Sequence, residues 1–307
     1  MLLFFVIFVV SITILLIASD KFVDAAERIG LALGIPSFIV GVTIVAFGTS
    51  LPELATSIAS VFAGSSEVVI GNAVGSNITN ILLVLGAAAI YGKGIKIEYD
   101  VMNTDVPMLF GSTFLMYFAL QDLTLSTFEC IIFLCALAVF LLNSFNSGKE
   151  EDSVKDKTSG KDWLILALGA VAIFFSAKYT IYAMENMATL MDIPVHIISI
   201  TAVALGTSLP EVIVSISAAK KGNHGMAVGN VLGSNIFNTY AVMAIPGLIG
   251  DLTIPADTLI FSVPFMMVVT ILFGVICLTR RISVWEGYML IVFYIFFIGL
   301  LLEKQLM

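Results

Sequence analysis

Two copies of one hexapeptide are the residues of this chain best suited to chemistry. Residues 48–53 read Gly-Thr-Ser-Leu-Pro-Glu, and residues 206–211 repeat the same six residues. Each copy lies in an apolar stretch long enough to cross a bilayer, where an acidic side chain costs ~3 kcal/mol on insertion scales. Glu53 and Glu211 therefore need either a partner or a function.

The proline of each hexapeptide points to that function. A proline nitrogen has no hydrogen to donate to the carbonyl one turn back, so Pro52 and Pro210 leave backbone carbonyls without a partner. The carbonyls expected to be freed are those near Ala46, Gly48 and Thr49, and near Ala204, Gly206 and Thr207. Carbonyls, hydroxyls and a carboxylate at a helix break form an oxygen-rich cage, which hard cations prefer. We expect a membrane cation transporter built around two such cages, not an enzyme.

The composition independently indicates a membrane protein. The chain has 307 residues, of which 59% are hydrophobic and 12% are charged, about half the charged share of a soluble domain. Stretches of bilayer length fall at residues 2–27, 37–62, 67–91, 101–120, 126–145, 161–188, 195–219, 225–249, 258–278 and 283–302. We therefore predict an all-α membrane protein with ten transmembrane helices. We expect the protein to interact with the lipid bilayer and with its transported ions, and we expect no nucleic acid, protein partner or resident cofactor.

The two halves of the chain are copies of each other. At a constant offset of 158, residues 35–80 align with residues 193–238 without a gap, and 22 of the 46 positions are identical. The polar stretch between the halves predicts a short linker at 146–160, dividing a first repeat (1–145) from a second (161–307). Because each repeat holds an odd number of helices, five, the second must enter the membrane inverted. Inverted repeats with broken helices are typical of secondary transporters.

The basic residues predict the orientation. In the ten-helix arrangement nearly all lysines and arginines fall on the side of the linker, whereas the opposite side keeps Lys178 and Lys304 and carries several acids. By the positive-inside rule, the linker is cytoplasmic and both termini are outside the cell membrane. The acids of the outer side would attract cations or simply solvate the loops.

Polar side chains also form a stripe in the third and in the eighth helix. Asn72, Ser76 and Asn80 are spaced four apart, as are Asn230, Ser234 and Asn238, so each set lines one helix face. Glycines at 71, 75, 229 and 233 would let neighbouring helices approach closely. Helix packing alone accounts for these stripes. It does not account for two symmetric glutamates beside freed carbonyls.

The charge of the expected site limits its cargo. Glu53 and Glu211 together contribute −2, which one divalent cation or two or more monovalent cations can neutralise. Ca²⁺ accepts six to eight oxygen ligands in a flexible arrangement, whereas Mg²⁺ dehydrates reluctantly. The lack of nearby histidine, cysteine or aspartate disfavours a transition metal. These residues therefore favour Ca²⁺.

The paired hexapeptides, each followed by Gly-Asn-x-x-Gly-Ser-Asn-Ile-x-Asn, resemble the repeats of sodium/calcium exchangers in the calcium:cation antiporter superfamily, of the prokaryotic or archaeal type. The likeness covers essentially the whole chain. It implies exchange of about three Na⁺ for each Ca²⁺ by alternating access, with the first and sixth helices sliding across a fixed core. It implies a site whose Ca²⁺ and Na⁺ ligands come from Glu53, Glu211, Thr49, Thr207, Ser50, Ser208, Ser76, Ser234, Asn80, Asn238, Ala46 and Ala204, with the glutamates and threonines as the metal ligands proper.

Two departures bear on the coupled ion. Potassium-dependent relatives, and some archaeal exchangers, place an aspartate where this chain has Asn238, whereas potassium-independent animal exchangers have amides at both central positions, as this chain does. The resemblance therefore implies K⁺-independent exchange. The charge count implies that exchange is electrogenic, because three Na⁺ would leave the site of −2 at +1. Proton-coupled relatives carry a glutamate shortly after Gly-Asn, which is absent after Gly71-Asn72 and Gly229-Asn230. An H⁺-coupled or K⁺-dependent antiporter is the alternative. A channel or a cation sensor could use a similar cage, but an inverted repeat favours two half-paths opened in turn.

Overall fold

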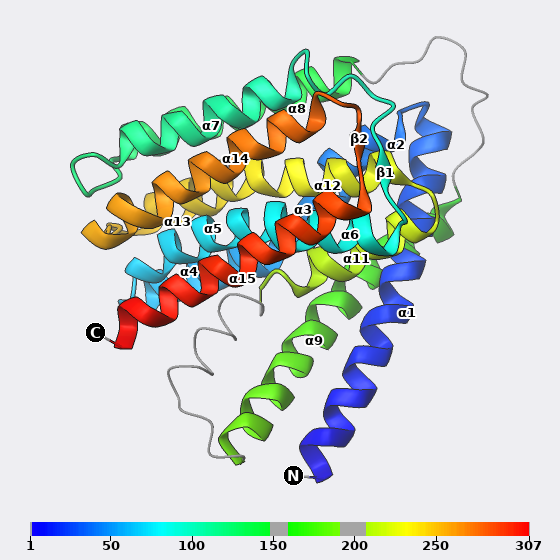
Figure 1. The fold of residues 1–307 in the computed structure, drawn as a ribbon, viewed down its shortest axis with the longest axis horizontal. Coiled ribbons are helices and arrows are strands. Elements are labelled where there is room, and N and C mark those ends of the chain that lie inside the picture. Colours follow the sequence, from blue (N-terminus) through cyan, green and yellow to red (C-terminus); the bar gives the residue numbers. More distant parts are fainter. Residues whose placement is uncertain (1, 148–158, 191–206, 307) are drawn as a thin grey trace.

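The structure, a computed structural model, describes residues 2–147, 159–190 and 207–306. The described residues are almost entirely helical (Figure 1). The α-helices are α1 (Leu2–Leu33), α2 (Ser37–Val40), α3 (Ala46–Thr49), α4 (Leu51–Phe62), α5 (Glu67–Thr79), α6 (Leu85–Tyr91), α7 (Asp105–Ala119), α8 (Thr127–Ser147), α9 (Gly160–Leu190), α11 (Leu209–Lys220), α12 (His224–Phe237), α13 (Met243–Ile249), α14 (Val263–Cys277) and α15 (Val284–Leu306). Four π-helical turns continue or precede them: η1 (Gly41–Val45), η2 (Asn80–Val84), η3 (Asn238–Val242) and η4 (Thr258–Ser262).

These elements correspond to the ten predicted spans, with three boundaries shifted by four residues or more. Seven helical runs within the described residues are long and apolar enough to cross a membrane. The first helix continues to Leu33 instead of residue 27, and the last ends at Leu306 instead of residue 302. The fourth begins at Asp105 instead of residue 101, because residues 101–104 form turns. The N-terminal part of the predicted seventh helix, 195–206, and most of the predicted linker, 148–158, lie outside the described residues.

Helices α1 and α9 run side by side and lean away from the layered body of the molecule (Figure 1). Phe22 of α1 packs on Gly169 of α9, where an added Cβ would lie 3.2 Å from the Phe22 Cβ. At the 158-residue offset, Ser11 corresponds to Gly169 and Thr180 corresponds to Phe22. Ser11 and Thr180 form the equivalent contact, a buried hydrogen bond of 2.9 Å. The pair is thus held by matched contacts along its length.

Helix α12 packs backbone against backbone on the α2–η1–α3 segment. A Cβ on Gly229 would lie 2.3 Å from the Phe38 carbonyl oxygen, and one on Gly233 would lie 2.3 Å from that of Val42. The predicted close approach is confirmed for these two glycines. A Cβ added to Gly71 or Gly75 would meet no atom of the described residues within 4 Å, and the segment that the repeat would bring against these glycines is part of 191–206, outside the described residues.

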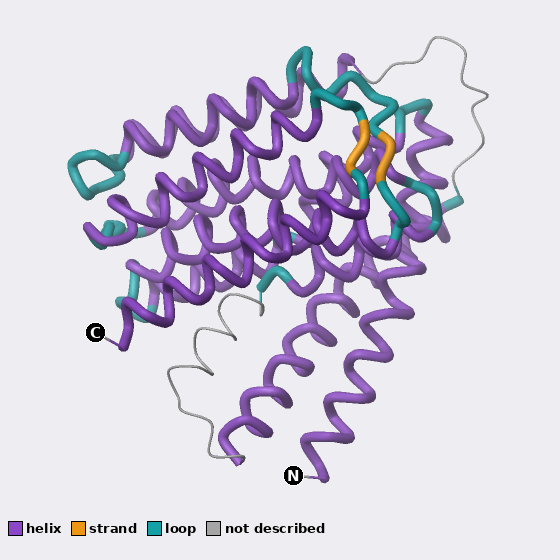
Figure 2. Tube along the Cα trace, in the orientation of Figure 1, coloured by secondary structure: helices purple, strands orange, loops and turns teal. Residues whose placement is uncertain are grey.

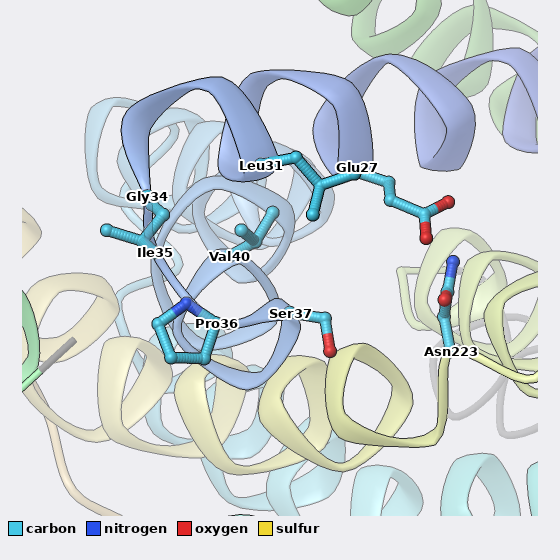
Figure 3. A pocket seen from close by; sticks show the side chains of 8 residues that line it. All are labelled: Glu27, Leu31, Gly34, Ile35, Pro36, Ser37, Val40 and Asn223. Atoms are coloured by element: carbon cyan, nitrogen blue, oxygen red, sulfur yellow. The ribbon is translucent and has the colours of Figure 1, made fainter. Parts of the chain in front are cut away.

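A short turn joins α1 to this packed segment. Gly34 adopts φ +69, a left-handed conformation that glycine tolerates without strain, and Pro36 is the N-cap of α2. The turn borders a cavity of about 220 Å³, in which the Glu27 side chain extends toward Asn223 (Figure 3). The joint between α1 and the core is therefore loosely filled.

The basic residues gather at one end of the bundle. There β1 (Ile95–Lys96) and β2 (Arg281–Ile282) form a two-stranded antiparallel ribbon that the sequence did not predict (Figure 2). The Lys96 backbone N–H donates to His224 at the start of α12. Nearby ion pairs join Arg280 to Asp100, Lys221 of α11 to Asp24 of α1, and Arg28 of α1 to Asp162 of α9.

Candidate ion-binding site

Each hexapeptide breaks its helix at the serine, not at the proline. Ser50 has φ −88 and ψ 4, and Ser208 has φ −87 and ψ 4, so the two breaks have the same geometry. The prolines follow in the first turns of α4 and α11, where a missing N–H costs nothing. Glu53 and Glu211 lie in those first turns, near the positive ends of the helix dipoles.

The Ala46 carbonyl is less free than the proline predicts. It accepts the Ser50 backbone N–H at 3.0 Å, and the Thr49 hydroxyl lies 3.4 Å away. A carbonyl oxygen has two lone pairs. The Ser50 N–H occupies one of them, and the Thr49 hydroxyl has a shorter contact with Asn230, so the second lone pair of the Ala46 carbonyl can bind an ion. The equivalent carbonyl of Ala204 lies outside the described residues.

The two repeats exchange polar contacts across the core. The Thr49 hydroxyl donates to Asn230 Oδ1 at 3.1 Å, and the Thr207 hydroxyl donates to Asn72 Oδ1 at 3.2 Å. These bonds are equivalent under the 158-residue offset with the halves swapped, as a two-fold axis requires. Each polar stripe therefore contacts the hexapeptide of the opposite repeat.

Two serines that the sequence patterns did not single out accept hydrogen bonds from the side chains of Asn72 and Asn230 and fix their orientation. Asn72 Nδ2 donates to Ser57 Oγ, and Asn230 Nδ2 donates to Ser215 Oγ, both at 2.9 Å. Ser57 and Ser215 are identical at the repeat offset and lie four residues after the glutamates. That spacing, which puts each serine on the same helix face as its glutamate, is the signal that could have found them.

The two carboxylates share one centre. Glu53 and Glu211 are each 0% exposed and interact electrostatically with each other. Hydroxyls of the opposite repeat lie near each one: Thr207 for Glu53, and Thr49 and Ser50 for Glu211. The oxygens expected at the two hexapeptides thus lie around one centre to which both repeats contribute, which is the arrangement that the joint charge of −2 assumes.

The amides at the ends of the polar stripes behave differently from each other. Asn80 and Asn238 begin η2 and η3, and π-helical turns occur frequently at functional sites. Asn80 Nδ2 donates to Asn235 Oδ1 at 3.0 Å, whereas both side-chain polar atoms of Asn238 lack a partner among the described residues. The counterpart of Asn235 in the first repeat, Asn77, donates to Thr239 instead, at 2.9 Å.

The remaining predicted residues also lie in this region. Ser76 and Thr207 hydroxyls are 3.3 Å apart, Ser234 Oγ is 3.5 Å from Asn230 Oδ1, and Ser50 Oγ donates to Glu211 Oε1 at 3.3 Å. Ser208 is fully buried.

Several buried oxygens of the site have no hydrogen-bond donor within the described part of the chain. They are both carboxylate oxygens of Glu53, Oε2 of Glu211, Oδ1 of Asn80, Oδ1 of Asn238 and the Ser208 hydroxyl. Buried acceptors without partners are costly, and a carboxylate pair without a counter-charge is costlier still. In the described ranges no group of three or more His, Cys, Asp or Glu residues could hold a metal. The atoms named here as lacking a hydrogen-bond donor are all oxygens, the ligand type that hard cations prefer.

Comparison with known proteins agrees with this geometry. The family described as "Sodium/calcium exchanger protein" matches residues 3–146 and 161–302. The chain is 34% identical to the sodium/calcium exchanger MaX1 of Methanosarcina acetivorans, over 97% of this chain and 98% of that one. It is 32% identical to the putative antiporter CaxA of Alkalimonas amylolytica, over 93% and 94%.

The fold is shared with a solved exchanger. A structure of the sodium-calcium exchanger NCX_Mj soaked with zero Na⁺ and Ca²⁺ superposes with a TM-score of 0.86 and 28% identity, covering 98% of this chain and 99% of that one. The same exchanger soaked with 100 mM Na⁺ and 10 mM Sr²⁺ gives 0.85. The ten-helix architecture with two family repeats is confirmed. The protein is a multi-pass membrane protein that belongs to the sodium/calcium exchanger family, a family of antiporters and not of enzymes.

Proposed function

We propose that this protein exchanges Na⁺ for Ca²⁺ across the cell membrane by alternating access. One observation carries the proposal: two fully buried carboxylates from symmetric helix breaks converge, and three of their four oxygens have no partner in the described residues. Among the described residues no lysine or arginine forms an ion pair with either glutamate. A bound cation would neutralise them. Similarity to MaX1 and NCX_Mj supports Na⁺ and Ca²⁺ as the ions.

In this proposal the ligands come in symmetric pairs. Glu53 and Glu211, with the threonine hydroxyls beside them, bind Ca²⁺ and share in binding Na⁺. The serines of the hexapeptides and stripes complete the Na⁺ sites together with the carbonyls of Ala46 and Ala204. Asn80 and Asn238 stand at the centre. The full set is Glu53, Glu211, Thr49, Thr207, Ser50, Ser208, Ser76, Ser234, Asn80, Asn238, Ala46 and Ala204.

Ca²⁺ uptake into proteoliposomes tests the proposal. Uptake should require an opposing Na⁺ gradient, be reversed when that gradient is reversed, and be absent when choline replaces Na⁺. A channel would pass Ca²⁺ without the Na⁺ gradient, and a sensor would bind Ca²⁺ without moving it. Uptake driven equally well by a proton gradient alone would instead favour the H⁺-coupled alternative.

We further propose that exchange is independent of K⁺, and Asn238→Asp tests the reason. The Asn238 amide is buried and has no hydrogen-bond partner among the residues that the structure describes, so an aspartate there would add a third carboxylate beside the other two. Three carboxylates crowded in a low dielectric cannot all stay ionised without another cation or a proton. The variant should therefore gain a dependence of Ca²⁺ uptake on K⁺ or pH that the parent lacks.

The matched control is Asn223→Asp, the same change at the N-cap of α12, away from the site. Its uptake should respond to K⁺ and pH as the parent does. A parent that requires K⁺ would contradict the proposal, as would an Asn238→Asp variant indifferent to both ions.

The orientation is also proposed. The end at which Lys96, Lys221 and Arg280 gather would be cytoplasmic, together with the linker at 146–160, and both termini would be outside. Repeats 1–145 and 161–307 would then be related by an axis in the membrane plane.

At this basic end, α1 is tied to the core by a polar contact, defined here as the α1–α11 latch. Lys221 Nζ lies 2.6 Å from Asp24 Oδ1 and 2.8 Å from the Asp20 carbonyl oxygen, and the Ser217 hydroxyl donates to Asp20. If α1 moves during exchange, as the resemblance implies, the latch must open. It would stabilise the state closed at the cytoplasmic end.

Lys221→Met should weaken the latch. A partly exposed ion pair contributes about 0.2–1 kcal/mol, so the population with α1 displaced should rise by up to about fivefold. Spin labels on Lys21→Cys of α1 and Arg281→Cys of β2, with the native cysteines replaced, would report it as a longer distance component. Lys220→Met is the control, because Lys220 lies over the Tyr91 ring at 5.0 Å and not against α1. Identical distance distributions in both variants would contradict the latch.

A further inference from the structure

A second cavity lies behind the ion site, on the side of α1 and α9. It measures about 430 Å³, and we name it the lateral cavity, bounded chiefly by Phe22, Phe47, Gly48, Phe145, Trp163 and Ala170. The lining side chains are apolar except for the indole N–H of Trp163 and the hydroxyl of Thr43, which donates to the Ile39 carbonyl at 2.7 Å. Mainly apolar cavities of this kind stay dry or take apolar ligands.

The lateral cavity opens toward the lipid. Three of its rim side chains are large and exposed: Phe47 at 52%, Phe145 at 48% and Trp163 at 45%. They lie on α3, α8 and α9, within runs that are long and apolar enough to cross the membrane. Because a bilayer surrounds such helices, the medium that enters the opening is hydrocarbon, and the occupant must be apolar.

The floor of the lateral cavity belongs to the ion-binding helix. Phe22 of α1 is 1% exposed and lies against Gly48, where an added Cβ would be 3.0 Å from the Phe22 ring. Gly48 directly precedes Thr49, which contacts Asn230 in the site. A molecule in the cavity would therefore contact α9, through Trp163 and Ala170, and the α3–α4 segment at the same time. Helices α1 and α9 are those that the resemblance implies to move, and the α3–α4 segment carries Thr49 and Glu53 of the candidate site.

We propose that the lateral cavity binds one acyl chain of a bilayer phospholipid, which restrains α1 and α9 against the α3–α4 segment. Its volume falls within the usual range for ligand pockets, about 300–1,000 Å³. The driving force is van der Waals contact, because the chain leaves one apolar medium for another. Trp163 is a residue type favoured at the membrane interface, and the exposed Lys161, two residues before it, provides a positive charge for the lipid phosphate. The restraining role rests on the proposed exchange, whereas occupancy does not.

Photo-crosslinking tests occupancy without transport. A phosphatidylglycerol with a diazirine near the end of one acyl chain would be reconstituted with the protein, and adducts would be mapped by mass spectrometry. Adducts are expected on 163–170 of α9 and on the peptide containing Phe47, in excess of those on Phe296 of α15, an exposed residue outside the cavity. Equal labelling at all these positions would overturn the site.

Two variants that fill the lateral cavity, and one control variant, test whether the crosslinks arise from a lipid inside it. Ala167→Phe and Ala170→Phe place a ring inside the cavity, so labelling of Phe47 should fall to the level at Phe296. Leu168→Phe makes a similar change on the same helix but outside the cavity, at a residue 59% exposed, and should label as the parent does. Undiminished Phe47 labelling in both filling variants would overturn the proposal.

Transport tests the restraining role. Phytanoyl chains carry methyl branches that we expect the cavity to exclude, so they should raise the exchange rate of the parent and leave that of Ala170→Phe unchanged. Equal responses in both proteins, with the adducts found as expected, would overturn the restraint alone. A parent that fails to couple Ca²⁺ uptake to Na⁺ would contradict the proposed function and leave the adduct result standing.

Discussion

Glu53→Gln and Glu211→Gln should each abolish Na⁺-driven Ca²⁺ uptake. Both carboxylates are fully buried and share one centre, so either change removes half of the charge that balances a divalent ion. In the loaded site the oppositely charged partners are the carboxylates and Ca²⁺, and removing one partner of a buried ion pair costs about 3–5 kcal/mol, which corresponds to at least about a 100-fold loss of Ca²⁺ affinity. Uptake would be measured with radioactive Ca²⁺ in proteoliposomes at matched protein density.

Stability separates this effect from misfolding. In cation-free buffer each variant should be at least as stable to heat as the parent, because it no longer buries an uncompensated negative charge. The parent alone should gain stability when Ca²⁺ is added, since ligands that bind only the folded state stabilise it. Glu67→Gln, at an exposed glutamate in the first turn of α5, should transport normally. Near-parental uptake by Glu53→Gln or Glu211→Gln would contradict a two-carboxylate site.

The helices and their repeat could be predicted because each depends on local sequence. Apolar length marks a span wherever it occurs, and the shared residues of 35–80 and 193–238 mark the duplication. The β1–β2 ribbon could not be found in this way. Its strands are two residues each and pair Ile95 with Ile282, so no periodicity is long enough to detect. The π-helical turns at Asn80 and Asn238 likewise have no sequence period of their own.

The sequence predicts which residues gather in the candidate site better than it predicts which helices face each other there. Helical spacing shows that Asn72 and Ser76 share a face, but not which helix they face. That pairing depends on close backbone packing at Gly229 and Gly233, and it sends Thr49 to Asn230 and Thr207 to Asn72. The sequence therefore indicated the oxygens at each hexapeptide and their joint charge, but not which helices bring the two hexapeptides together. Whether the named oxygens bind ions stays a prediction.

Exchange should be electrogenic, and membrane voltage should change its equilibrium strongly. We expect Glu53 and Glu211 to be ionised when cations are bound between them, whereas the central amides of Asn80 and Asn238 are neutral. Ca²⁺ then leaves the site uncharged, whereas about three Na⁺ leave it at +1, so one net charge crosses the membrane in each cycle. Moving one charge through 100 mV is worth ~2.3 kcal/mol, which changes the equilibrium Ca²⁺ ratio by roughly 50-fold.

The measurement sets voltage with valinomycin and K⁺ in proteoliposomes that hold a fixed Na⁺ gradient. A tenfold K⁺ gradient imposes about 59 mV, at which a single net charge changes the limiting Ca²⁺ ratio about tenfold. The same K⁺ gradient without valinomycin is the control, because it keeps any K⁺ coupling and removes the voltage. A ratio that follows the K⁺ gradient even without valinomycin would mean that K⁺ is a substrate. A ratio unchanged by valinomycin would mean that only two Na⁺ balance each Ca²⁺, as expected if no charge remains uncompensated.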